Sequence, residues 1–436
     1  MARRNPYDPL VNRRVYLDNA ATSFPKPPSV FDAMVRYGRD VGASPGRGHY
    51  SESREGARII ATCRQRLCTL FNGESADHVV FALNTSDALN LAIKGVVRAA
   101  IREKRARGGG GDARPAHVVT TAMDHNSVLR PLNALKEDGL VEWTLVECDP
   151  QTGRVAPSAV CHAMRDDTVL VAINHASNVS GVIQPIAQIG KACHEKGVLF
   201  LVDAAQSAGH VPIDVREACI DLLAFPGHKG LLGPQGTGGL YIRPGVVHRV
   251  ATSREGGTGH LSEHDVQPDD MPQRYEAGSH NTIGIAGLSE GVQWLLDRGI
   301  AACRAHELEL IGVMLDGLRA RGCRMLDGQA SPSGPLSQVR LLGPTEPTQR
   351  VGTFSFLHDT LTPVEIAMGL ESGFGILARS GIHCAPYAHR TLGSMERDGA
   401  LGACRLSFGP FVTVDDVRYA LDAMAQVCAA IEPASR

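Results

Sequence analysis

The chain has 436 residues, enough for two or three domains or for one large domain with a smaller one beside it. Its 44 lysine and arginine residues nearly balance 46 aspartate and glutamate residues. No strong positive field therefore favours a nucleic acid or an anionic membrane as partner. A small-molecule ligand is the better expectation.

The cysteine content and the N-terminus indicate the cellular compartment of the protein. Eleven cysteines are spread along the chain without a CxxC pair or a repeated spacing, which is typical of a reducing compartment. The charged first residues are not followed by the apolar stretch of a signal peptide, and no segment reaches about eighteen uninterrupted apolar residues. We therefore expect an unsecreted, cytoplasmic protein.

Short apolar runs alternate with longer helix-compatible stretches, a pattern typical of βαβ units. Strands are predicted over 78–82, 117–122, 168–173, 198–202, 221–225 and 238–242. Because these runs are apolar without alternation, both faces of their sheet are expected to lie beneath helices. The sequence thus predicts an α/β fold with a mostly parallel central sheet and helices on both faces.

Two runs rich in glycine, proline or serine, 105–115 and 326–350, are predicted to be surface insertions. Residues 284–320 are predicted to form one long amphipathic helix. Short strands over 351–357 and 404–409 then indicate a smaller α+β C-terminal domain.

The predicted organisation has three parts. They are an N-terminal segment packing with the small domain (1–30), a large α/β domain (31–295) and a small C-terminal domain that carries the segment around Cys384 (296–436).

Polar residues follow the predicted strands, at the positions where open α/β sheets bind their ligands. Thr85 and Ser86 follow the first strand and open a helix, whose free N–H groups suit a phosphate, although taken alone they are better explained by an ordinary N-cap. His125 follows the second strand and Asn178 the third.

Asp203 and Lys229 follow the next two strands. A carboxylate at the mouth of an apolar sheet needs a partner, and a structural salt bridge is the alternative to a functional role. A desolvated lysine has a lowered pKa and can act as a nucleophile, although most lysines lie at the surface. Together, a phosphate cradle, a buried carboxylate, a strand-end histidine and a strand-end lysine indicate a site for pyridoxal phosphate.

The chain also contains, in this order, the stretches DNAAT, HNSVLRPL, SNVSGVIQPI, VDAAQSAGH, GHKGLLGPQGTGGLY, YEAGSHNT and RSGIHCAPYAH. With them it resembles the class V aminotransferase family of fold type I pyridoxal-phosphate enzymes. Within that family it is most similar to the cysteine desulfurases and the selenocysteine lyase-like members. The resemblance implies pyridoxal 5′-phosphate as cofactor and a homodimer.

Carried to this chain, the resemblance implies that Lys229 forms the Schiff base with the cofactor and that His125 stacks on its ring and takes part in catalysis. Asp203 would pair with the ring nitrogen, and Gln206 would hydrogen-bond the phenolic oxygen.

The phosphate would contact Thr85, Ser86 and His228, with Ser279 reaching it from the second subunit. Asn178 would contact both cofactor and substrate.

The resemblance also implies a reaction. L-cysteine, or L-selenocysteine, would bind through Asn178, Arg379 and Arg405, and Cys384 would accept sulfur as a persulfide while L-alanine leaves. A protein would then take the sulfur from Cys384. The alternatives are a selenocysteine lyase, a carbon–sulfur lyase, an aminotransferase or epimerase of the same fold, and a non-catalytic sulfur-binding scaffold.

Cys384 lies between two histidines. Arg379, His383 and His389 are nearby positive or potentially positive groups that could lower the pKa of its thiol. The alternative of a buried apolar cysteine is the usual one for this residue type. A zinc site is not predicted, because the two histidines and the cysteine have no third and fourth ligand at a suitable spacing beside them.

Two positions depart from the family pattern. Pro226 stands where a phosphate-binding serine or threonine is usual, and proline donates no hydrogen bond. Ile382 stands where the closest subgroup often has histidine.

Overall fold

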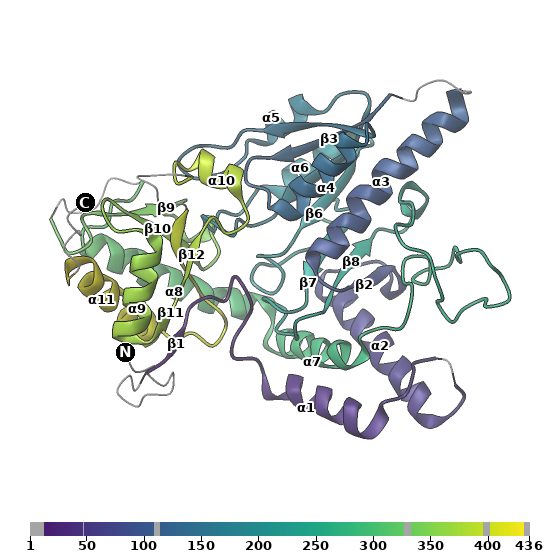
Figure 1. The fold of residues 1–436 in the computed structure, drawn as a ribbon, viewed down its shortest axis with the longest axis horizontal. Coiled ribbons are helices and arrows are strands. Elements are labelled where there is room, and N and C mark those ends of the chain that lie inside the picture. The colour runs from purple at the N-terminus through teal and green to yellow at the C-terminus, as the bar shows by residue number, and fades with distance from the viewer. Residues whose placement is uncertain (1–12, 47, 109–113, 327–332, 396–401, 431–436) are drawn as a thin grey trace, which may run out of the picture.

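The computed structural model describes residues 13–46, 48–108, 114–326, 333–395 and 402–430. Figure 1 shows a larger part built around one sheet and a smaller part beside it. The central sheet has seven strands in the order β2-β8-β7-β6-β5-β3-β4. They are β2 (Val79–Ala82), β3 (Ala116–Thr121), β4 (Val141–Val146), β5 (Thr168–Asn174), β6 (Leu199–Asp203), β7 (Leu222–Pro226) and β8 (Gly238–Ile242).

The strand directions bring several chain segments to one edge of this sheet. The pairs β7–β6, β6–β5, β5–β3 and β3–β4 are parallel, whereas β8 is antiparallel to both β7 and β2. β2 therefore points the same way as β7. The carboxyl ends of β2, β3, β5, β6 and β7 consequently face the same side, where open α/β sheets bind ligands.

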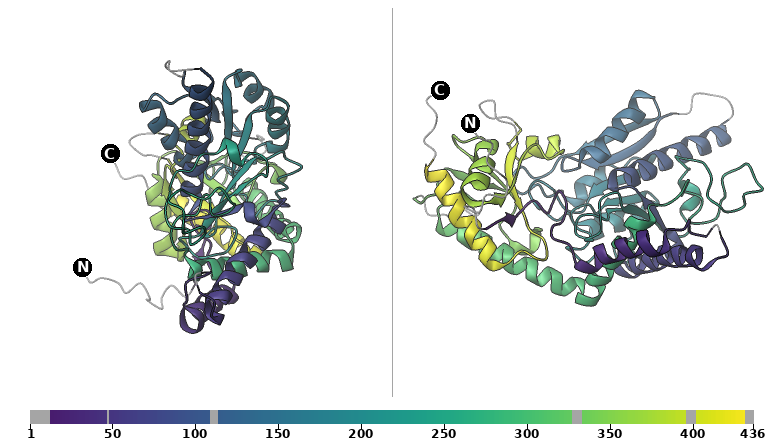
Figure 2. Two further views of the ribbon diagram at one scale, coloured as in Figure 1. Left: turned by 90° about the vertical axis from the view of Figure 1, so that its right-hand side faces the viewer. Right: turned by 60° about the horizontal axis from the view of Figure 1, so that its bottom comes forward.

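Helices cover both faces of the sheet, as the apolar strands predict (Figure 2). On one face, α3 (Thr85–Gly108) and α4 (Asn126–Glu137) share a core with Val80, Val118 and Leu201. On the other face, residues such as Phe200 and Phe225 pack in a core with four helices of the larger part. These are α2 (Ser51–Leu70), α5 (Pro157–Ala163), α6 (Ile186–Glu195) and α7 (Thr282–Arg298).

The smaller part has its own core around a four-stranded antiparallel sheet in the order β12-β13-β10-β9. Its strands are β9 (Val339–Leu342), β10 (Thr353–His358), β12 (Arg379–Gly381) and β13 (Ala403–Ser407). Its helices are α8 (Ile300–Ala320), α9 (Pro363–Phe374), α10 (Pro386–Thr391) and α11 (Val414–Ala430).

The N-terminal segment joins both parts. β1 (Val15–Tyr16) pairs in parallel with β11 (Ile376–Leu377) of the smaller part. The chain then continues to α1 (Pro28–Arg36), and the following π-helical turn Tyr37–Val41 ends at Gly42, which has a left-handed conformation. The segment between β1 and α1 thus runs past the sheet edge described above. The division into domains stays a prediction, and its boundary at residue 295 falls inside α7.

Three expectations from the sequence are wrong in detail. Residues 284–320 do not form one helix, because Gly299 adopts a φ of 80° and separates α7 from α8. The run 326–350 is not only an insertion, since β9 lies within it; residues 327–332 lie outside the described residues. The run 105–115 begins with the last turn of α3, and residues 109–113 lie outside the described ones.

β4 was not predicted, because its partly exposed side chains at the sheet edge do not form a continuous apolar run.

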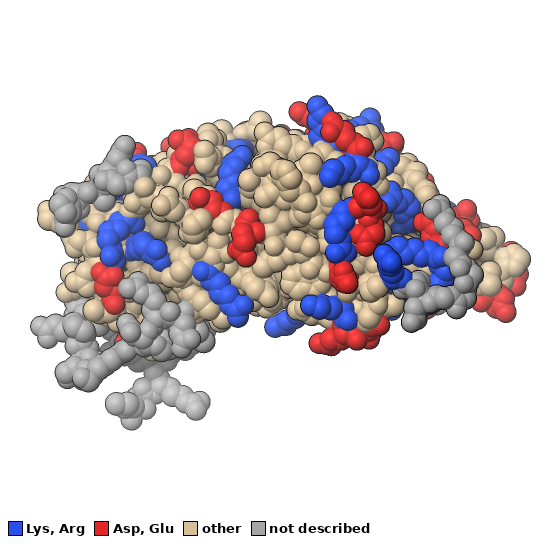
Figure 3. Space-filling model, turned by 90° about the horizontal axis from the view of Figure 1, so that it is seen from above, with Lys and Arg blue, Asp and Glu red and all other residues tan. Residues whose placement is uncertain are grey.

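Basic and acidic side chains lie next to one another on the face shown in Figure 3, around a broad area with neither. Among the described residues, no helix combines the length and the apolar character needed to span a membrane.

Candidate active site

A cavity of about 280 Å³ lies at the edge of the large sheet where the five strand ends meet. The structure gathers most of the predicted cofactor residues around it. They are Thr85, Ser86, His125, Asn178, Asp203, Gln206, His228 and Lys229. Lining residues that received no predicted role are Ala21, Asn84, Ser127, Asn174, Ala176 and Ala205. A larger hollow of about 530 Å³, beside the C-terminal half of α3, contains none of the predicted residues.

Lys229 and Asp203 have opposite pKa shifts in this cavity. Burial lowers the pKa of the Lys229 amine to about 8, so a substantial fraction is neutral near physiological pH. Asp203 is 3% exposed, and burial raises the pKa of its carboxyl to about 6, while the backbone N–H of Ala205 donates to its Oδ1 at 2.9 Å. The site therefore combines a nucleophilic amine with a carboxylate that favours a cationic partner.

The first turns of two helices also line the cavity. Thr85 and Ser86 begin α3, where backbone N–H groups have no intrahelical partner. The Ser86 and Ser127 hydroxyls lie 2.6 Å apart, and the backbone N–H of Ser127 donates to His125 Nδ1 at 3.1 Å. Because Nδ1 accepts this bond, the ring proton is assigned to Nε2. Burial lowers the pKa of His125 to about 4, so the ring is neutral.

The N-terminal segment holds the loop that carries Lys229. Four donors converge on the carbonyl oxygen of His228: Thr22 Oγ1 at 3.0 Å, Ser23 N at 3.0 Å, Ser23 Oγ at 3.2 Å and Lys26 Nζ at 3.2 Å. Burial also lowers the pKa of Lys26 to about 8. None of these three N-terminal residues had been assigned a role, although the DNAAT stretch, which ends at Thr22, was the available signal.

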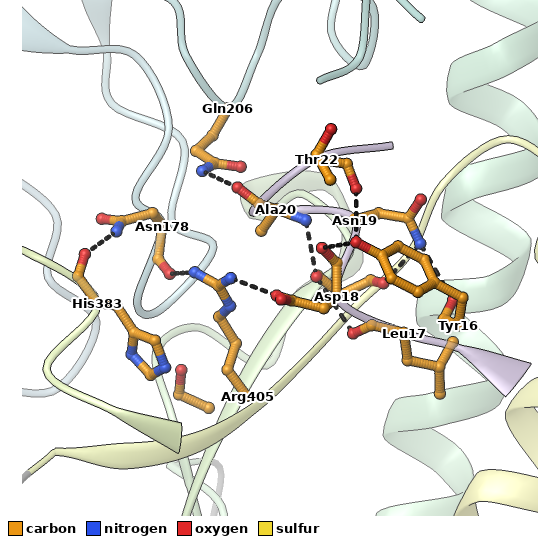
Figure 4. A network of polar contacts seen from close by, with 12 residues as sticks. Tyr16, Leu17, Asp18, Asn19, Ala20, Thr22, Asn178, Gln206, His383 and Arg405 are labelled. Atoms are coloured by element: carbon orange, nitrogen blue, oxygen red, sulfur yellow. Dashed lines mark hydrogen bonds and ion pairs between the residues drawn. The ribbon is translucent and has the colours of Figure 1, made fainter. Parts of the chain in front are cut away.

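A second set of contacts runs from the same segment to the smaller part (Figure 4). Arg405 on β13 is 1% exposed, and its guanidinium donates to Asp18 Oδ1 at 2.7 Å and to the backbone oxygen of Asn178 at 3.1 Å. Gln206 Nε2 donates to the backbone oxygen of Ala20 at 3.0 Å. Figure 4 shows Asp18 and Asn178 on opposite sides of the guanidinium. Asp18 thus fixes a residue expected to bind the substrate carboxylate.

Four predicted site residues do not line the cavity, namely Arg379, Arg405, Ser279 and Cys384. Arg379 lies on β12 and pairs in register with Arg405, and its positive charge contributes to the lowered pKa values of Lys229 and His125. Ser279 lines a separate hollow near Leu83. Its predicted contact with the phosphate of another subunit stays a prediction.

Cys384 lies in the turn between β12 and α10, and it is exposed. The backbone N–H of Asn126, the residue after His125, donates to the Cys384 oxygen at 2.8 Å, so this turn contacts the rim of the cavity. The interpretation of Cys384 as a buried apolar cysteine is wrong.

The two histidines beside Cys384 differ from the expectation. His383 and His389 are buried, with their ring nitrogens 3.3 Å apart. Burial lowers the pKa of His389 to about 4 and that of His383 even further. Both rings are therefore neutral and cannot lower the pKa of the thiol by their charge. Among the residues that the structure describes, no three metal-binding side chains lie close enough to hold an ion.

The two residues that depart from the family pattern lie at the end of a sheet strand and in the Cys384 turn. Pro226 is the last residue of β7 and pairs with Gly238 of β8. Ile382 is partly buried in the turn, where its oxygen accepts a bond from the backbone N–H of Ala385 at 3.2 Å.

The residues around the cavity fit pyridoxal phosphate. His228 Nδ1 and Asn174 Oδ1 are buried and, within the described parts of the chain, have no hydrogen-bond partner. Buried polar atoms of this kind are normally satisfied, so both favour a polar ligand. The start of α3 suits a phosphate, and Asp203 and Lys229 suit a protonated ring nitrogen and an aldehyde.

Comparisons with known proteins agree with this geometry. The family model described as aminotransferase class V matches residues 15–419. A probable cysteine desulfurase of Methanothermobacter thermautotrophicus is 34% identical over 91% of this chain and 90% of its own, and one of Aeropyrum pernix is 30% identical over 97% of both. The apo structure of a cysteine desulfurase from Thermococcus onnurineus NA1 superposes with a TM-score of 0.83 at 29% identity, covering 97% of this chain and 96% of that one. The chain belongs to the class V aminotransferase family and has the fold of its pyridoxal-phosphate enzymes.

Proposed function

We propose that this protein is a pyridoxal-phosphate-dependent cysteine desulfurase, which converts L-cysteine to L-alanine and transfers the sulfur to Cys384 as a persulfide. The observation that carries the proposal is the exposed Cys384 thiol, on a turn hydrogen-bonded beside His125 at the rim of a cavity that contains Lys229 and Asp203. The relatives named cysteine desulfurases support it. An aminotransferase would have no use for a thiol at this place.

The residues of the cavity have distinct tasks in this proposal. Thr85, Ser86 and His228 would hold the phosphate, and Asp203 would hold a proton at the ring nitrogen. When bound, the cofactor supplies an acceptor for the electron pair left at the substrate Cα when its proton is removed. The Lys229 amine takes that proton, because its lowered pKa makes the neutral form available.

The substrate carboxylate is assigned to a positively charged part of the site. Arg405 is held by Asp18, and Arg379 lies beside it on β12. Asn178 lines the cavity and also contacts both Arg405 and the Cys384 turn. These contacts would direct the substrate sulfur towards the small part of the molecule.

The sulfur transfer balances without an external oxidant. Cys384 Sγ forms a bond to the substrate sulfur as the substrate Cβ–S bond breaks, and the electron pair of that bond stays on carbon. Cβ takes up a proton, Lys229 returns to Cα the proton that it removed, and the product leaves as L-alanine. The persulfide on Cys384 then passes its outer sulfur to an acceptor, for which we propose a protein, because the thiol is exposed.

A homodimer belongs to the proposal. Large apolar side chains are exposed on α1 and at the start of α7, namely Phe31, Val35 and Ile283. Ser279, which lies four residues before Ile283, would thereby come near the phosphate of the other subunit. Apolar side chains exposed together commonly mark such contacts.

The test is replacement of Cys384 by serine. The formation of alanine from L-cysteine is expected to fall by about a hundredfold or more, because serine cannot accept the sulfur. Mass spectrometry of the wild type after one turnover should find one extra sulfur on the peptide that contains Cys384. Cys161→Ser, a half-buried cysteine of α5, is the matched control and should keep full activity. Unchanged alanine formation in Cys384→Ser would contradict the proposal.

A further inference from the structure

The turn that presents Cys384 has a strained backbone. His383 and Cys384 have φ values of 54° and 58°, so two consecutive residues with side chains adopt the left-handed conformation. This conformation costs about 1 to 2 kcal/mol per residue for such residues. It persists only where the surrounding structure imposes it. Some contact must therefore hold residues 383 and 384 in place.

The backbone of the turn is bonded to the larger part of the molecule. Asn178 Nδ2 donates to the oxygen of His383 at 2.5 Å, and Asn126 N donates to the oxygen of Cys384 at 2.8 Å. Asn126 is the first residue of α4, where a backbone N–H has no intrahelical acceptor. Asn178 lines the cavity, and Asn126 lies between two residues that line it, so the left-handed conformation places both carbonyl groups beside the cavity.

The side chain of His383 is held from the opposite direction, by the smaller part. Its ring is 4% exposed, and its Nδ1 lies 3.3 Å from Nε2 of His389, whose Nδ1 lies 2.8 Å from the Ser394 hydroxyl. That hydroxyl donates to the backbone oxygen of His389 at 3.4 Å. The hydroxyl oxygen therefore accepts from Nδ1–H of His389, and Nε2 of His389 accepts from Nδ1–H of His383. These contacts assign the donors from His383 to Ser394.

We propose that His383 is a positioning residue for Cys384: its ring, fixed by His389 and Ser394, and its carbonyl, fixed by Asn178, together hold the left-handed turn that keeps Cys384 at the rim of the cavity. This inference rests on the proposed function for the role of Cys384 in the reaction. His383 acts through the turn and not by proton transfer, because its buried ring disfavours the charged form that a base must adopt.

Hydrogen exchange at the Asn126 amide tests the positioning directly in the cofactor-loaded protein. The bond to Cys384 is what protects this amide, so a loosened turn must expose it. His383→Leu places an apolar side chain in the buried position but removes the donor to His389, and leucine disfavours a positive φ. We expect exchange at Asn126 to become about tenfold faster. His162→Leu is the matched control, because His162 is exposed and its Nδ1 contacts the Ser158 oxygen within the same helix, and it should leave the rate unchanged.

Two further variants keep the test decisive if His383→Leu does not fold. His383→Asn retains an N–H donor, and asparagine tolerates the left-handed region, so exchange should return to within about threefold of the wild type. Ser394→Ala removes only the outer end of the contacts and should accelerate exchange by about threefold. The proposal is overturned if the exchange rate at Asn126 is unchanged in Ser394→Ala and stays as fast in His383→Asn as in His383→Leu.

Kinetics provide the second measurement. A thiol displaced by about 1 Å is expected to lower kcat for alanine formation by 10- to 100-fold in His383→Leu. KM for L-cysteine, the visible absorption of the bound cofactor and the alkylation rate of Cys384 by iodoacetamide should each stay within about twofold, because cavity and thiol remain intact. Loss of the cofactor absorption along with kcat, or a fall in kcat without faster exchange at Asn126, would overturn the proposal. Full activity of Cys384→Ser would refute the proposed function, while the exchange rates would still decide whether His383 holds the turn.

Discussion

The cavity at the sheet edge and the Cys384 turn hold their reactive groups by different physical means. Lys229 and Asp203 lie at the ends of neighbouring parallel strands, so a buried, regular sheet fixes them and burial tunes their pKa values. Cys384 is exposed on a short turn whose backbone is strained and whose contacts come from both parts of the molecule. In the proposed function, chemistry on the substrate carbon would take place in a rigid site, and sulfur transfer at an exposed turn.

Replacement of Lys229 should affect the cavity strongly and leave the Cys384 turn unchanged. Lys229→Ala is expected to lower alanine formation by about a thousandfold or more, because both the cofactor attachment and the base are lost. The alkylation rate of Cys384 should not change, since none of its contacts involves Lys229. Lys191→Ala, on the exposed side of α6, is the control. A parallel loss of Cys384 reactivity would show that the two regions are not independent.

The rigidity of the cavity depends on a second buried carboxylate. Asp124 accepts bonds from Thr120 Oγ1, from the N–H and the hydroxyl of Thr121, and from the N–H of Asn174, and so ties the ends of β3 and β5 together. Asp124→Ala leaves these donors unpaired, and we expect the free energy of unfolding in urea to fall by about 3 kcal/mol.

The control for this change is Asp167→Ala, whose carboxylate pairs with Arg165 at the surface and should cost less than about 1 kcal/mol. Equal losses in the two variants would argue against a specially rigid cavity.

The pH dependence of cofactor uptake tests the tuning by burial. A neutral amine is needed for the attachment, and the pKa of Lys229 is lowered from 10.5 to about 8. The uptake rate of pyridoxal phosphate by the apo-protein should therefore rise about tenfold between pH 7 and 9 and then level off. Asp203→Asn removes a negative charge that raises this pKa, so the midpoint should move to lower pH. A rate still rising above pH 10 would contradict the lowered pKa.

Relief of the backbone strain in the Cys384 turn should have the smallest effect, and it should increase stability where the other changes reduce stability or activity. Cys384→Gly should raise the free energy of unfolding by about 0.5 to 1 kcal/mol, because glycine adopts a positive φ without a steric cost and the exposed thiol buries little surface. Ala385→Gly is the neighbouring control, with a φ of −133°, and should be destabilising. If both variants lose stability equally, the turn stores no strain.

Residues with a local signature were predicted well, and residues defined by distant contacts were not. Thr85, His125, Asp203 and Lys229 each follow an apolar strand, and parallel strands bring their carboxyl ends together, so the cavity followed from the pattern. Asp18 and Lys26 received no role, because their partners Arg405 and His228 lie far away in the sequence. The expected charge on His383 and His389 failed for the same reason, since their burial depends on packing in the smaller part.

By itself, the sequence determined the α/β class, most strands of the central sheet, the family and the residues at the strand ends, because hydrophobic periodicity and short motifs are local properties. The tertiary structure alone decided the strand order, the break at Gly299, the place of the N-terminal segment over the Lys229 loop and the left-handed turn at Cys384. Each of these depends on burial or on hydrogen bonds between residues distant in the chain, which no local pattern encodes.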